Sequence, residues 1–372
     1  MSASLKHAVS DLLNGTGVDL NGSAPHDLRV RDERFYARVL SGGSLALGES
    51  YMDGWWDCEA IDEMVALLLK GNIRSKIKPT FGMAKNALLA QVMNRQFGAR
   101  AFHIGKAHYD IGNDLYTRML DKRLTYTCGY WKTAMNLDDA QEAKLDLVCR
   151  KIGLQRGQRV LDIGCGWGSF AKFAAEKYGA HVVGVTVSKE QMALAQTLCK
   201  GLTVDIRLQD YRSVNETFDH IISLGMFEHV GHKNYRTYFE VARRCLKDDG
   251  LFLLHTIGGN RSSITTDPWI EKFIFPDSLI PSAAQITKAA EGLFVMEDWH
   301  NFGTDYDKTL MAWYANVEQH WVELAGKYDE RFHRMWRYYL LACAATFRVR
   351  QNQLWQIVYS KNGIPGGYSS IR

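Results

Sequence analysis

From about residue 140 onward, short apolar runs rich in β-branched residues alternate with helical segments of ten or more residues. The runs are QRVLDI, HVVGVTV, TVDIRL, FDHIISL and GLFLLHTI. This alternation predicts a parallel sheet with helices on both faces. Two later runs, LFVMEDWHNF and LWQIVYSK, are expected to close one edge of the sheet. Between them ERFHRMWRYYLLACAATFRVR predicts a long helix, and an inserted cap is expected from Trp269 to Pro281.

The first strand runs into the glycine-rich stretch VLDIGCGWG, which contains Asp162, Gly164, Gly166 and Gly168. Glycine has no Cβ, so the backbone can turn sharply and approach a ligand closely, and the following helix presents its N-terminus to that ligand. Dinucleotide-binding folds use G-x-G-x-x-G, whereas this stretch has G-x-G-x-G with an acidic residue two positions before it. The combination is typical of methyltransferases that use S-adenosylmethionine (AdoMet), and it predicts AdoMet as the bound cofactor.

The ends of the next two strands are expected to complete the AdoMet pocket. The second strand ends in GVTVSKEQ, where Thr186, Ser188 and Gln191 stand in place of the acidic residue that usually holds the ribose. Their side chains are able to hydrogen-bond a ribose without that charge. The third strand ends in LQDYR, whose last three residues are expected to line the adenine pocket, with an ordinary surface turn as the alternative.

Composition limits the class of protein. A chain of 372 residues, 46% of them hydrophobic, can form one large domain plus a smaller one. Its seven cysteines are scattered and form no CxxC pair, so we expect no disulfide framework, no metal and a reducing cytoplasm. The N-terminal stretch MSASLKHAVSDLLNG is too polar for a signal peptide, and no run approaches the length of a membrane span. We therefore expect a cytoplasmic protein that meets a membrane only from the side.

The segment from Met64 to Tyr109 is strongly basic. It contains no Asp or Glu, and it has eight Lys or Arg residues, at positions 70, 74, 76, 78, 85, 95, 100 and 106. A basic linker between domains would have this composition, but most soluble surfaces intersperse both signs, so the bias predicts attraction to a polyanion. An apolar helix face among the cations favours an anionic bilayer over a nucleic acid. That face consists of Leu88, Leu89, Val92, Met93 and Phe97.

Two candidate reactive groups follow the fourth and fifth strands. Glu228 lies just after the fourth strand, in MFEHVG, and His255 closes the fifth, in LFLLHTIGG. Ligands of open parallel sheets bind beyond the carboxyl ends of the strands, so both side chains are expected to face the methyl group. A lone histidine is more often a satisfied core residue, but a carboxylate on the neighbouring element makes it a better candidate. Cys128, in LTYTCGYW, stays ambiguous because unpaired cysteines are often simply buried.

Nine stretches of the chain, in order, resemble the cyclopropane-fatty-acyl-phospholipid synthases and, more distantly, the mycolic acid cyclopropane synthases. They are GESYMDGWWDC, HYDIGNDLYTRMLD, YTCGYW, VLDIGCGWG, MFEHVG, LLHTIG, DPWIEKFIFP, EDWHNFGTDYDKTLMAWY and YYLLACAATFR. The resemblance extends from residue 48 to about residue 359, so it covers nearly the whole chain. GESYMDGWWDC and DPWIEKFIFP point to the bacterial, phospholipid-acting branch.

The resemblance implies a fold and a division into domains. The fold is the class I AdoMet-dependent methyltransferase (Rossmann-like) α/β fold, with a seven-stranded sheet and a smaller, mainly helical N-terminal domain. The expected domains are a lipid- or membrane-associated domain over residues 1–85, a basic linker over 86–106, and a catalytic domain over 107–372 with a cap insertion around 260–290.

The resemblance also implies a reaction. Such enzymes add a methylene across the cis double bond of an acyl chain: the alkene attacks the AdoMet methyl, and a proton leaves the resulting cation as the ring closes. The resemblance implies bicarbonate as the base, held by a cage of five residues, and it implies aromatic groups near the cation. Glu228 acting directly as the base is the simpler alternative. The matching cage residues are Cys128, Glu228, His255, the backbone at Ile257, and Tyr306.

Further site residues are implied in the same way. Cys343, in LLACAATF, matches a cysteine proposed as the family's active-site residue, although its apolar helical setting predicts a channel or core position with an inert neutral thiol. The residues expected around AdoMet, with Asp210 added from the third strand end, are Tyr126, Thr127, Val160, Leu161, Asp162, Ile163, Gly164, Cys165, Gly166, Trp167, Gly168, Thr186, Val187, Ser188, Lys189, Glu190, Gln191, Asp210, Tyr211 and Arg212.

The implied partner is a membrane phospholipid with unsaturated acyl chains, met by peripheral association with an anionic bilayer at the inner face of the membrane. The resemblance also implies a homodimer. No nucleic acid is expected, because no stacking-aromatic signature of an RNA module accompanies the basic segment. The alternatives are a related methyltransferase that makes a methyl-branched lipid or a methylated amine, and a binding module that uses AdoMet only as a structural ligand. Retention of all five cage residues favours ring closure.

Overall fold

The computed structural model describes residues 2–76 and 112–372. The chain forms two compact units, each assembled from three separate segments. One unit contains the described residues before 77 together with Ile264–Pro276 and Leu310–Asn352. The other contains the described residues from 112 to Ser263, together with Asp277–Thr309 and Gln353–Arg372.

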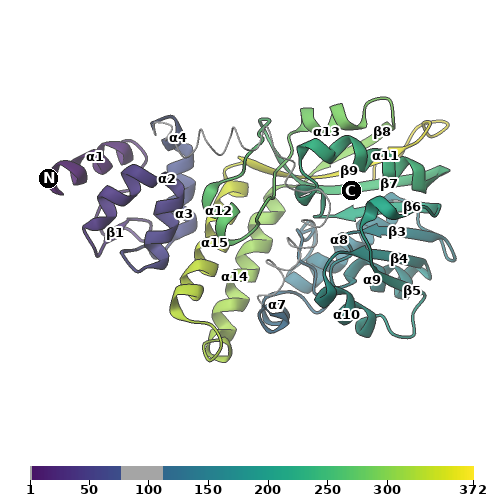
Figure 1. Ribbon diagram of the computed structural model, residues 1–372, viewed down its shortest axis with the longest axis horizontal. Helices are drawn as coiled ribbons and strands as arrows, with labels where there is room; N and C mark the ends of the chain where they lie inside the picture. Colours follow the sequence, from purple (N-terminus) through teal and green to yellow (C-terminus); the bar gives the residue numbers. More distant parts are fainter. Residues whose placement is uncertain (1, 77–111) are drawn as a thin grey trace. The chain divides into compact units, whose positions relative to one another are not determined.

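A seven-stranded sheet organises the second unit (Figure 1). Its order is β5-β4-β3-β6-β7-β9-β8, and the pairs β5–β4, β4–β3, β3–β6 and β6–β7 are parallel, whereas β9 and β8 are antiparallel. The predicted seven-stranded α/β sheet is confirmed, and the two late runs extend it beyond β7. The strands are β3 (Arg159–Ile163), β4 (His181–Thr186), β5 (Val204–Leu208), β6 (Phe218–Leu224), β7 (Leu246–Gly259), β8 (Val295–Asn301) and β9 (Asn352–Ser360).

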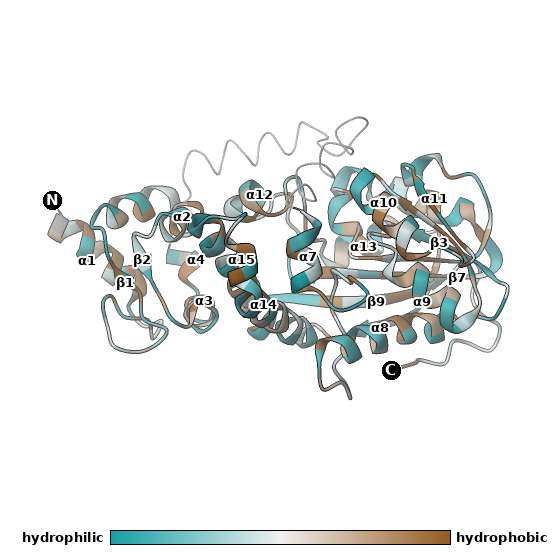
Figure 2. Cartoon of the chain, turned by 90° about the horizontal axis from the view of Figure 1, so that it is seen from below, coloured by the Kyte–Doolittle hydropathy of each residue, from teal (hydrophilic) through white to brown (hydrophobic). Residues whose placement is uncertain are grey.

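Helices cover both faces of this sheet. On one face, α8 (Leu137–Lys151), α9 (Ser169–Tyr178) and α10 (Lys189–Leu198) bury apolar side chains against the strands. On the other, α11 (Tyr235–Cys245) and α13 (Ala283–Ala290) do the same. In Figure 2 the helices change between teal and brown along their length, as amphipathic helices do. Side-chain caps fix where two of them begin, since Asn136 caps α8 and Ser188 caps α10.

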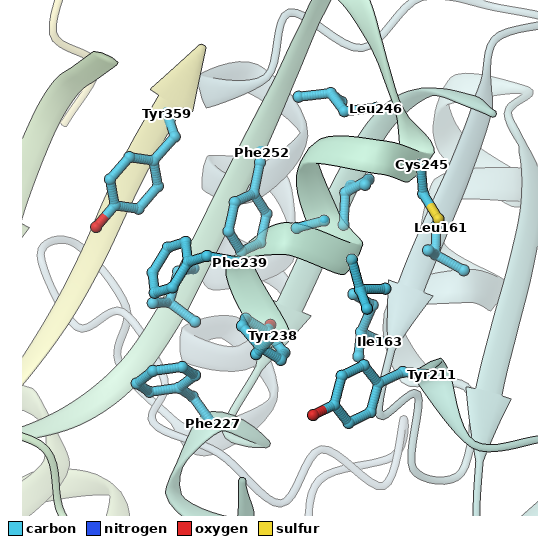
Figure 3. Close-up of a cluster of buried hydrophobic side chains, with 14 of the residues drawn as sticks. Leu161, Ile163, Tyr211, Phe227, Tyr238, Phe239, Cys245, Leu246, Phe252 and Tyr359 are labelled. Carbon is cyan, nitrogen blue, oxygen red and sulfur yellow. The ribbon is translucent and has the colours of Figure 1, made fainter. Parts of the chain in front are cut away.

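An aromatic cluster fills the space between the sheet and α11 (Figure 3). The Phe239 ring lies 6.0 Å from Phe252 on β7 and 5.5 Å from Tyr359 on β9, both in edge-on arrangements. Phe227, three residues after the end of β6, stacks on Tyr235 at 4.4 Å. These contacts anchor the chain immediately before Glu228 to the sheet core.

The first unit is mainly helical. Its segments before residue 77 are α1 (Ser2–Leu13), β1 (Arg29–Val30), α2 (Arg34–Met52), β2 (Trp56–Asp57), α3 (Ile61–Lys70) and α4 (Ile73–Lys76). α12 (Pro268–Phe273) packs on α2, and α15 (Glu330–Arg348) packs on α2 and α3. The predicted long helix is α15. α14 (Thr304–Leu324) begins in the second unit and continues into the first, and α7 (Asn113–Met119) belongs to the second.

Aromatic packing and a part-buried ion pair hold these segments together. A Cβ at Gly48 on α2 would lie 2.4 Å from the Trp269 ring on α12, so only glycine fits there. The Trp269 ring in turn lies 4.7 Å from Tyr338 on α15. Arg334 donates to the Trp56 carbonyl at 2.7 Å and to Asp57 at 2.9 Å, which joins α15 to β2.

These units divide the chain differently from the expected domains 1–85 and 107–372, because residues 264–276 and 310–352 pack with the N-terminal helices. The expected linker 86–106, the basic residues at 78, 85, 95, 100 and 106, and the apolar face between Leu88 and Phe97 lie outside the described residues. Of the helices formed by residues 2–76 and 112–372, none combines the length and apolar character needed to cross a membrane.

Candidate active site

The glycine turn after β3 is built for close approach of a ligand. Gly164 and Gly168 have φ angles of 83° and 80°, which favour glycine, and the Gly164 amide donates to the Val185 carbonyl at the β4 end at 3.0 Å. A Cβ at Gly164 would lie 2.5 Å from Met226 Cγ. At Gly166 it would meet no atom of the described residues within 4 Å. The described residues therefore pack tightly against Gly164 and leave space beside Gly166, as a turn that binds a cofactor requires.

Asp162 and Lys144 are two buried charged groups beside this turn. The exposed fraction is 2% for Asp162 and 0% for Lys144. Burial raises the pKa of Asp162 to about 7, and the positive charge of Lys144 opposes that rise. Burial likewise lowers the pKa of Lys144 to about 8, against the negative charge of Asp121.

The residues expected to hold the ribose are buried and bonded to one another. Thr186 Oγ1 donates to Gln191 Oε1 at 2.9 Å, and Ser188 Oγ accepts from the Gln191 amide at 3.3 Å as the cap of α10. At the next strand end, Asp210 accepts from the Arg212 Nε at 2.9 Å, which holds the pKa of Asp210 below its usual range despite burial. Tyr211, which lies between these two residues in the sequence, is buried. The ends of β3, β4 and β5 thus place these residues on one edge of the sheet. The hydrogen bonds of Thr186 and Ser188 with Gln191, and of Asp210 with Arg212, hold their side chains in place.

The segment YTCGYW runs along α8 and brings Thr127 and Cys128 to the same edge. Lys144 Nζ donates to Thr127 Oγ1, and Gln141 Nε2 donates to the Thr127 carbonyl, both at 2.7 Å. Thr309 on α14 accepts from the Gly129 amide at 3.0 Å and has its hydroxyl 3.9 Å from the Cys128 sulfur. Burial, with the negative charge of Asp305, raises the pKa of the Cys128 thiol well above its usual value, so this thiol is neutral.

Glu228 lies on a short 3₁₀ turn, η2 (Phe227–His229), after β6. Its Oε1 accepts from the Ile257 amide at 2.6 Å, and its backbone carbonyl accepts from the Leu279 amide at 2.8 Å. Oε2 is buried and has no hydrogen-bond partner among the residues that the structure describes. Burial raises the pKa of Glu228 to about 7, and the Ile257 amide opposes the rise. One oxygen is thus fixed while the other is left for a ligand.

His255 stands on the neighbouring strand, β7, where its carbonyl accepts from the Gly225 amide at 2.9 Å. Its Nδ1 lies 3.2 Å from the amide nitrogen of Gln356 on β9. The Gln356 side chain on β9 therefore holds the His255 ring in place from the neighbouring strand. Within the described part of the chain, the buried Nε2 has no hydrogen-bond partner. Burial, with the charges of Lys144 and Lys151, lowers the pKa of His255 well below its usual value, so the ring is neutral.

The predicted cage residues come from four elements of the second unit. Ile257 takes part through the amide that orients Glu228. Tyr306 lies one turn before Thr309 on α14, hence on the helix face that reaches Cys128. Cys343 belongs to the other unit, on α15, where burial raises its pKa to about 12, with the negative charge of Asp267 adding to the rise.

Sequence reasoning missed four polar residues that hold this arrangement. Gln356 is the polar residue in the apolar strand LWQIVY, which is a usable signal for a buried hydrogen bond. Lys144, Gln141 and Thr309 give no such signal, because polar residues on a helix are usually solvated. Across residues 2–76 and 112–372, the structure has no group of three His, Cys, Asp or Glu residues placed to hold a metal ion.

Known proteins resemble this chain over nearly its whole length. Residues 98–357 match the family model described as mycolic acid cyclopropane synthetase. The cyclopropane-fatty-acyl-phospholipid synthase of Escherichia coli strain K12 is 52% identical over 363 residues, which are 98% of this chain and 95% of that protein. A probable fatty acid methyltransferase of Pseudomonas putida is 37% identical over 94% of this chain and 91% of its own length.

Solved structures agree with the fold. The cyclopropane synthase MmaA2 of Mycobacterium tuberculosis is 32% identical with a TM-score of 0.66, over 70% of this chain and 98% of its own. The mycolic acid cyclopropane synthase CmaA1, in complex with SAH and CTAB, is 33% identical with a TM-score of 0.65 over the same shares. Coclaurine N-methyltransferase, at 23% identity and a TM-score of 0.69, shares the fold over 85% of this chain and 99% of its own.

Proposed function

Because the chain belongs to the mycolic acid cyclopropane synthetase family, we propose that it transfers a methylene group from AdoMet across the cis double bond of an unsaturated phospholipid acyl chain. The products are a cyclopropane fatty acyl phospholipid and S-adenosylhomocysteine. The class I AdoMet methyltransferase fold and the predicted family are confirmed. The observation that carries the reaction is the pair of buried atoms Glu228 Oε2 and His255 Nε2, both without a protein partner among the described residues.

The glycine turn and its neighbours are the proposed AdoMet site, with AdoMet supplying the methyl group. The open space at Gly166 suits the backbone of the turn to a ligand, and the α9 N-terminus that follows favours negative charge. Thr127 and the strand ends at Thr186 and Asp210 bound the same edge of the sheet.

We propose that the cage holds bicarbonate, whose chemical contribution is to accept the proton lost as the ring closes. Two features of the cage fit a small oxyanion. His255 is neutral, so its ring N–H is a hydrogen-bond donor that needs no counter-charge. Glu228 has a pKa of about 7, so its free Oε2 is able both to donate to an anion and to accept a proton at neutral pH. The neutral Cys128 thiol adds no negative charge to repel the anion.

The experiment that tests this function incubates the purified protein with AdoMet, bicarbonate and vesicles of cis-unsaturated phospholipid, followed by mass spectrometry of the acyl chains. We expect a gain of about 14 mass units, one CH2, with loss of the double bond on derivatisation. A methyl-branched or hydroxylated product would retain the cofactor and contradict ring closure. Absence of any lipid product would contradict the proposed substrate.

We also propose that the protein acts in the cytoplasm, as a homodimer, at the inner face of an anionic membrane. Support comes from the basic composition of residues 64–109 and from a substrate that resides in a bilayer. Analytical ultracentrifugation tests the dimer, since a single species of about 42 kDa would contradict it.

A further inference from the structure

We propose that Lys144 is a positioning residue of the cage: its buried ammonium fixes Thr127 and supplies the positive charge that lets an anion reside beside Cys128 and His255. The inference rests on the proposed function, because the anion is the bicarbonate of that reaction. It assigns a role to a residue of α8 that none of the sequence motifs contains.

Lys144 contacts the chain segment that carries Cys128. Its Nζ donates to Thr127 Oγ1 at 2.7 Å, and Thr127 immediately precedes Cys128. Gln141, one turn earlier on α8, holds the Thr127 carbonyl at 2.7 Å. A Cβ at Gly225 would lie 2.5 Å from Thr127 Cγ2, so Thr127 also packs on the turn between β6 and Glu228. Movement of the Lys144 side chain would therefore move the cysteine segment relative to the Glu228 turn.

Burial makes the charge of Lys144 costly unless the site uses it. An ammonium removed from water loses several kcal/mol of hydration, which is normally offset by an ion pair. Lys144 is fully buried, and its hydrogen bond within residues 2–76 and 112–372 goes to a neutral hydroxyl. An ammonium has three donors, so two remain. The negative charges of the buried Asp121 and Asp162 carboxylates offset part of this cost, and an anionic ligand bonded to the remaining donors would offset more of it.

The charge of Lys144 acts on both parts of the site. It lowers the pKa of Asp162 beside the glycine turn and that of Asp121. It also lowers the pKa of the Cys128 thiol and that of His255 in the cage. Burial is the main reason that His255 is neutral, and the positive charge of Lys144, which adds to this effect, also favours an anion placed next to the ring.

Lys151 provides a matched control on the same helix. It is also buried and lies seven residues, or two turns, after Lys144. Its Nζ lies 3.8 Å from Asp298 and 3.1 Å from His300 Nδ1, so its charge already has a carboxylate beside it. Removing it takes away a buried amine that also lowers the pKa of His255 but is already paired with a carboxylate, so it tests whether an unpaired ammonium is needed.

The test compares Lys144→Gln, Lys144→Arg, Thr127→Val and Lys151→Gln with the parent chain. Two quantities are measured: the rise in Tm that bicarbonate produces in the lipid-free protein, and the bicarbonate concentration for half-maximal turnover. For Lys144→Gln, which keeps a donor but loses the charge, we expect the Tm rise to vanish and the half-maximal concentration to increase by at least about tenfold. Lys144→Arg and Lys151→Gln are expected to stay within about threefold of the parent chain.

Retention of the parent bicarbonate response by folded Lys144→Gln would overturn the proposal. If Lys144→Gln does not fold, Thr127→Val decides, because it removes the hydrogen bond through which Lys144 fixes Thr127. An increase of at least about tenfold in the half-maximal bicarbonate concentration supports the positioning role, and a change within about threefold overturns it. A parent chain that shows the Tm rise but makes no lipid product contradicts the proposed function alone. A parent chain without either response overturns both.

Discussion

The Ile257 amide donates to Oε1 of Glu228 at 2.6 Å, and this bond helps to orient the carboxyl group. Ile257 stands on β7 and Glu228 on the turn after β6, so the bond joins the ends of two adjacent parallel strands. The second oxygen, Oε2, is buried with no hydrogen-bond partner in the described residues. The carboxyl group is therefore oriented by one oxygen and keeps the other available for a ligand.

Replacing Glu228 by Gln should separate chemistry from cofactor binding. The amide keeps the size of the side chain and an acceptor for Ile257, but it removes the group that accepts a proton. We expect kcat to fall by about 10² to 10⁴ while the AdoMet Kd changes by less than about threefold. Product analysis by mass spectrometry gives the first quantity and isothermal titration calorimetry the second. Weaker AdoMet binding with turnover intact would contradict this division of roles.

The same substitution should change how stability depends on pH. The pKa of Glu228 is raised from 4.5 to about 7, so between these values the folded chain holds a proton that the unfolded chain has lost. The free energy of unfolding therefore falls as pH rises through this window, and the loss is complete above pH 7. Relative to Glu228→Gln, the parent chain should lose roughly 3 kcal/mol between about pH 4.5 and about pH 7. Urea titrations of both proteins across this range measure it, and parallel curves would refute it.

Gly164→Ala should weaken AdoMet binding. The residue has a φ of 83°, and a Cβ there would lie 2.5 Å from Met226 Cγ, so the turn must shift. We expect the AdoMet Kd to rise at least about tenfold. Gly201→Ala is the control, because Gly201 has a φ of 84° and a Cβ there would meet no described atom within 4 Å. Calorimetry should show parent-like AdoMet binding for the control; equal losses in both would point to general strain.

Cys343→Ala should leave turnover within about threefold of the parent chain. The pKa of the Cys343 thiol is raised to about 12 by burial, so the nucleophilic thiolate is scarce at neutral pH. Iodoacetamide should accordingly alkylate the native protein slowly at this position, as followed by peptide mass spectrometry. A loss of turnover above about a hundredfold in a folded Cys343→Ala protein would return the residue to the catalytic site.

Neutralising several of the Lys and Arg residues between 70 and 106 should weaken binding to anionic vesicles. Each basic residue near such a surface contributes about 1 kcal/mol, and salt screens the attraction. Sedimentation with anionic and with neutral vesicles, at low and high salt, measures the effect. Unchanged sedimentation would mean that the segment is only a linker.

The sheet was predictable from the sequence because parallel strands buried on both faces leave continuous apolar runs. Glu228 and His255 were predictable because topology brings strand ends to one edge. The groups that tune them were not, because their partners are remote in the chain. Gln356 bonds a histidine 101 residues away, and Thr309 contacts Cys128 across 181 residues. Pairings at such separations leave no local pattern.

The three-segment construction of the first unit has a consequence for how the protein is made. Its N-terminal helices α2 and α3 leave the ribosome long before α12 and α15, against which they pack. Arg348, which bonds Asp62 at 2.7 Å, is separated from it by 286 residues of later synthesis. The unit therefore completes its core only after nearly the whole chain has emerged, and until then its apolar helix faces are open to chaperones or to self-association.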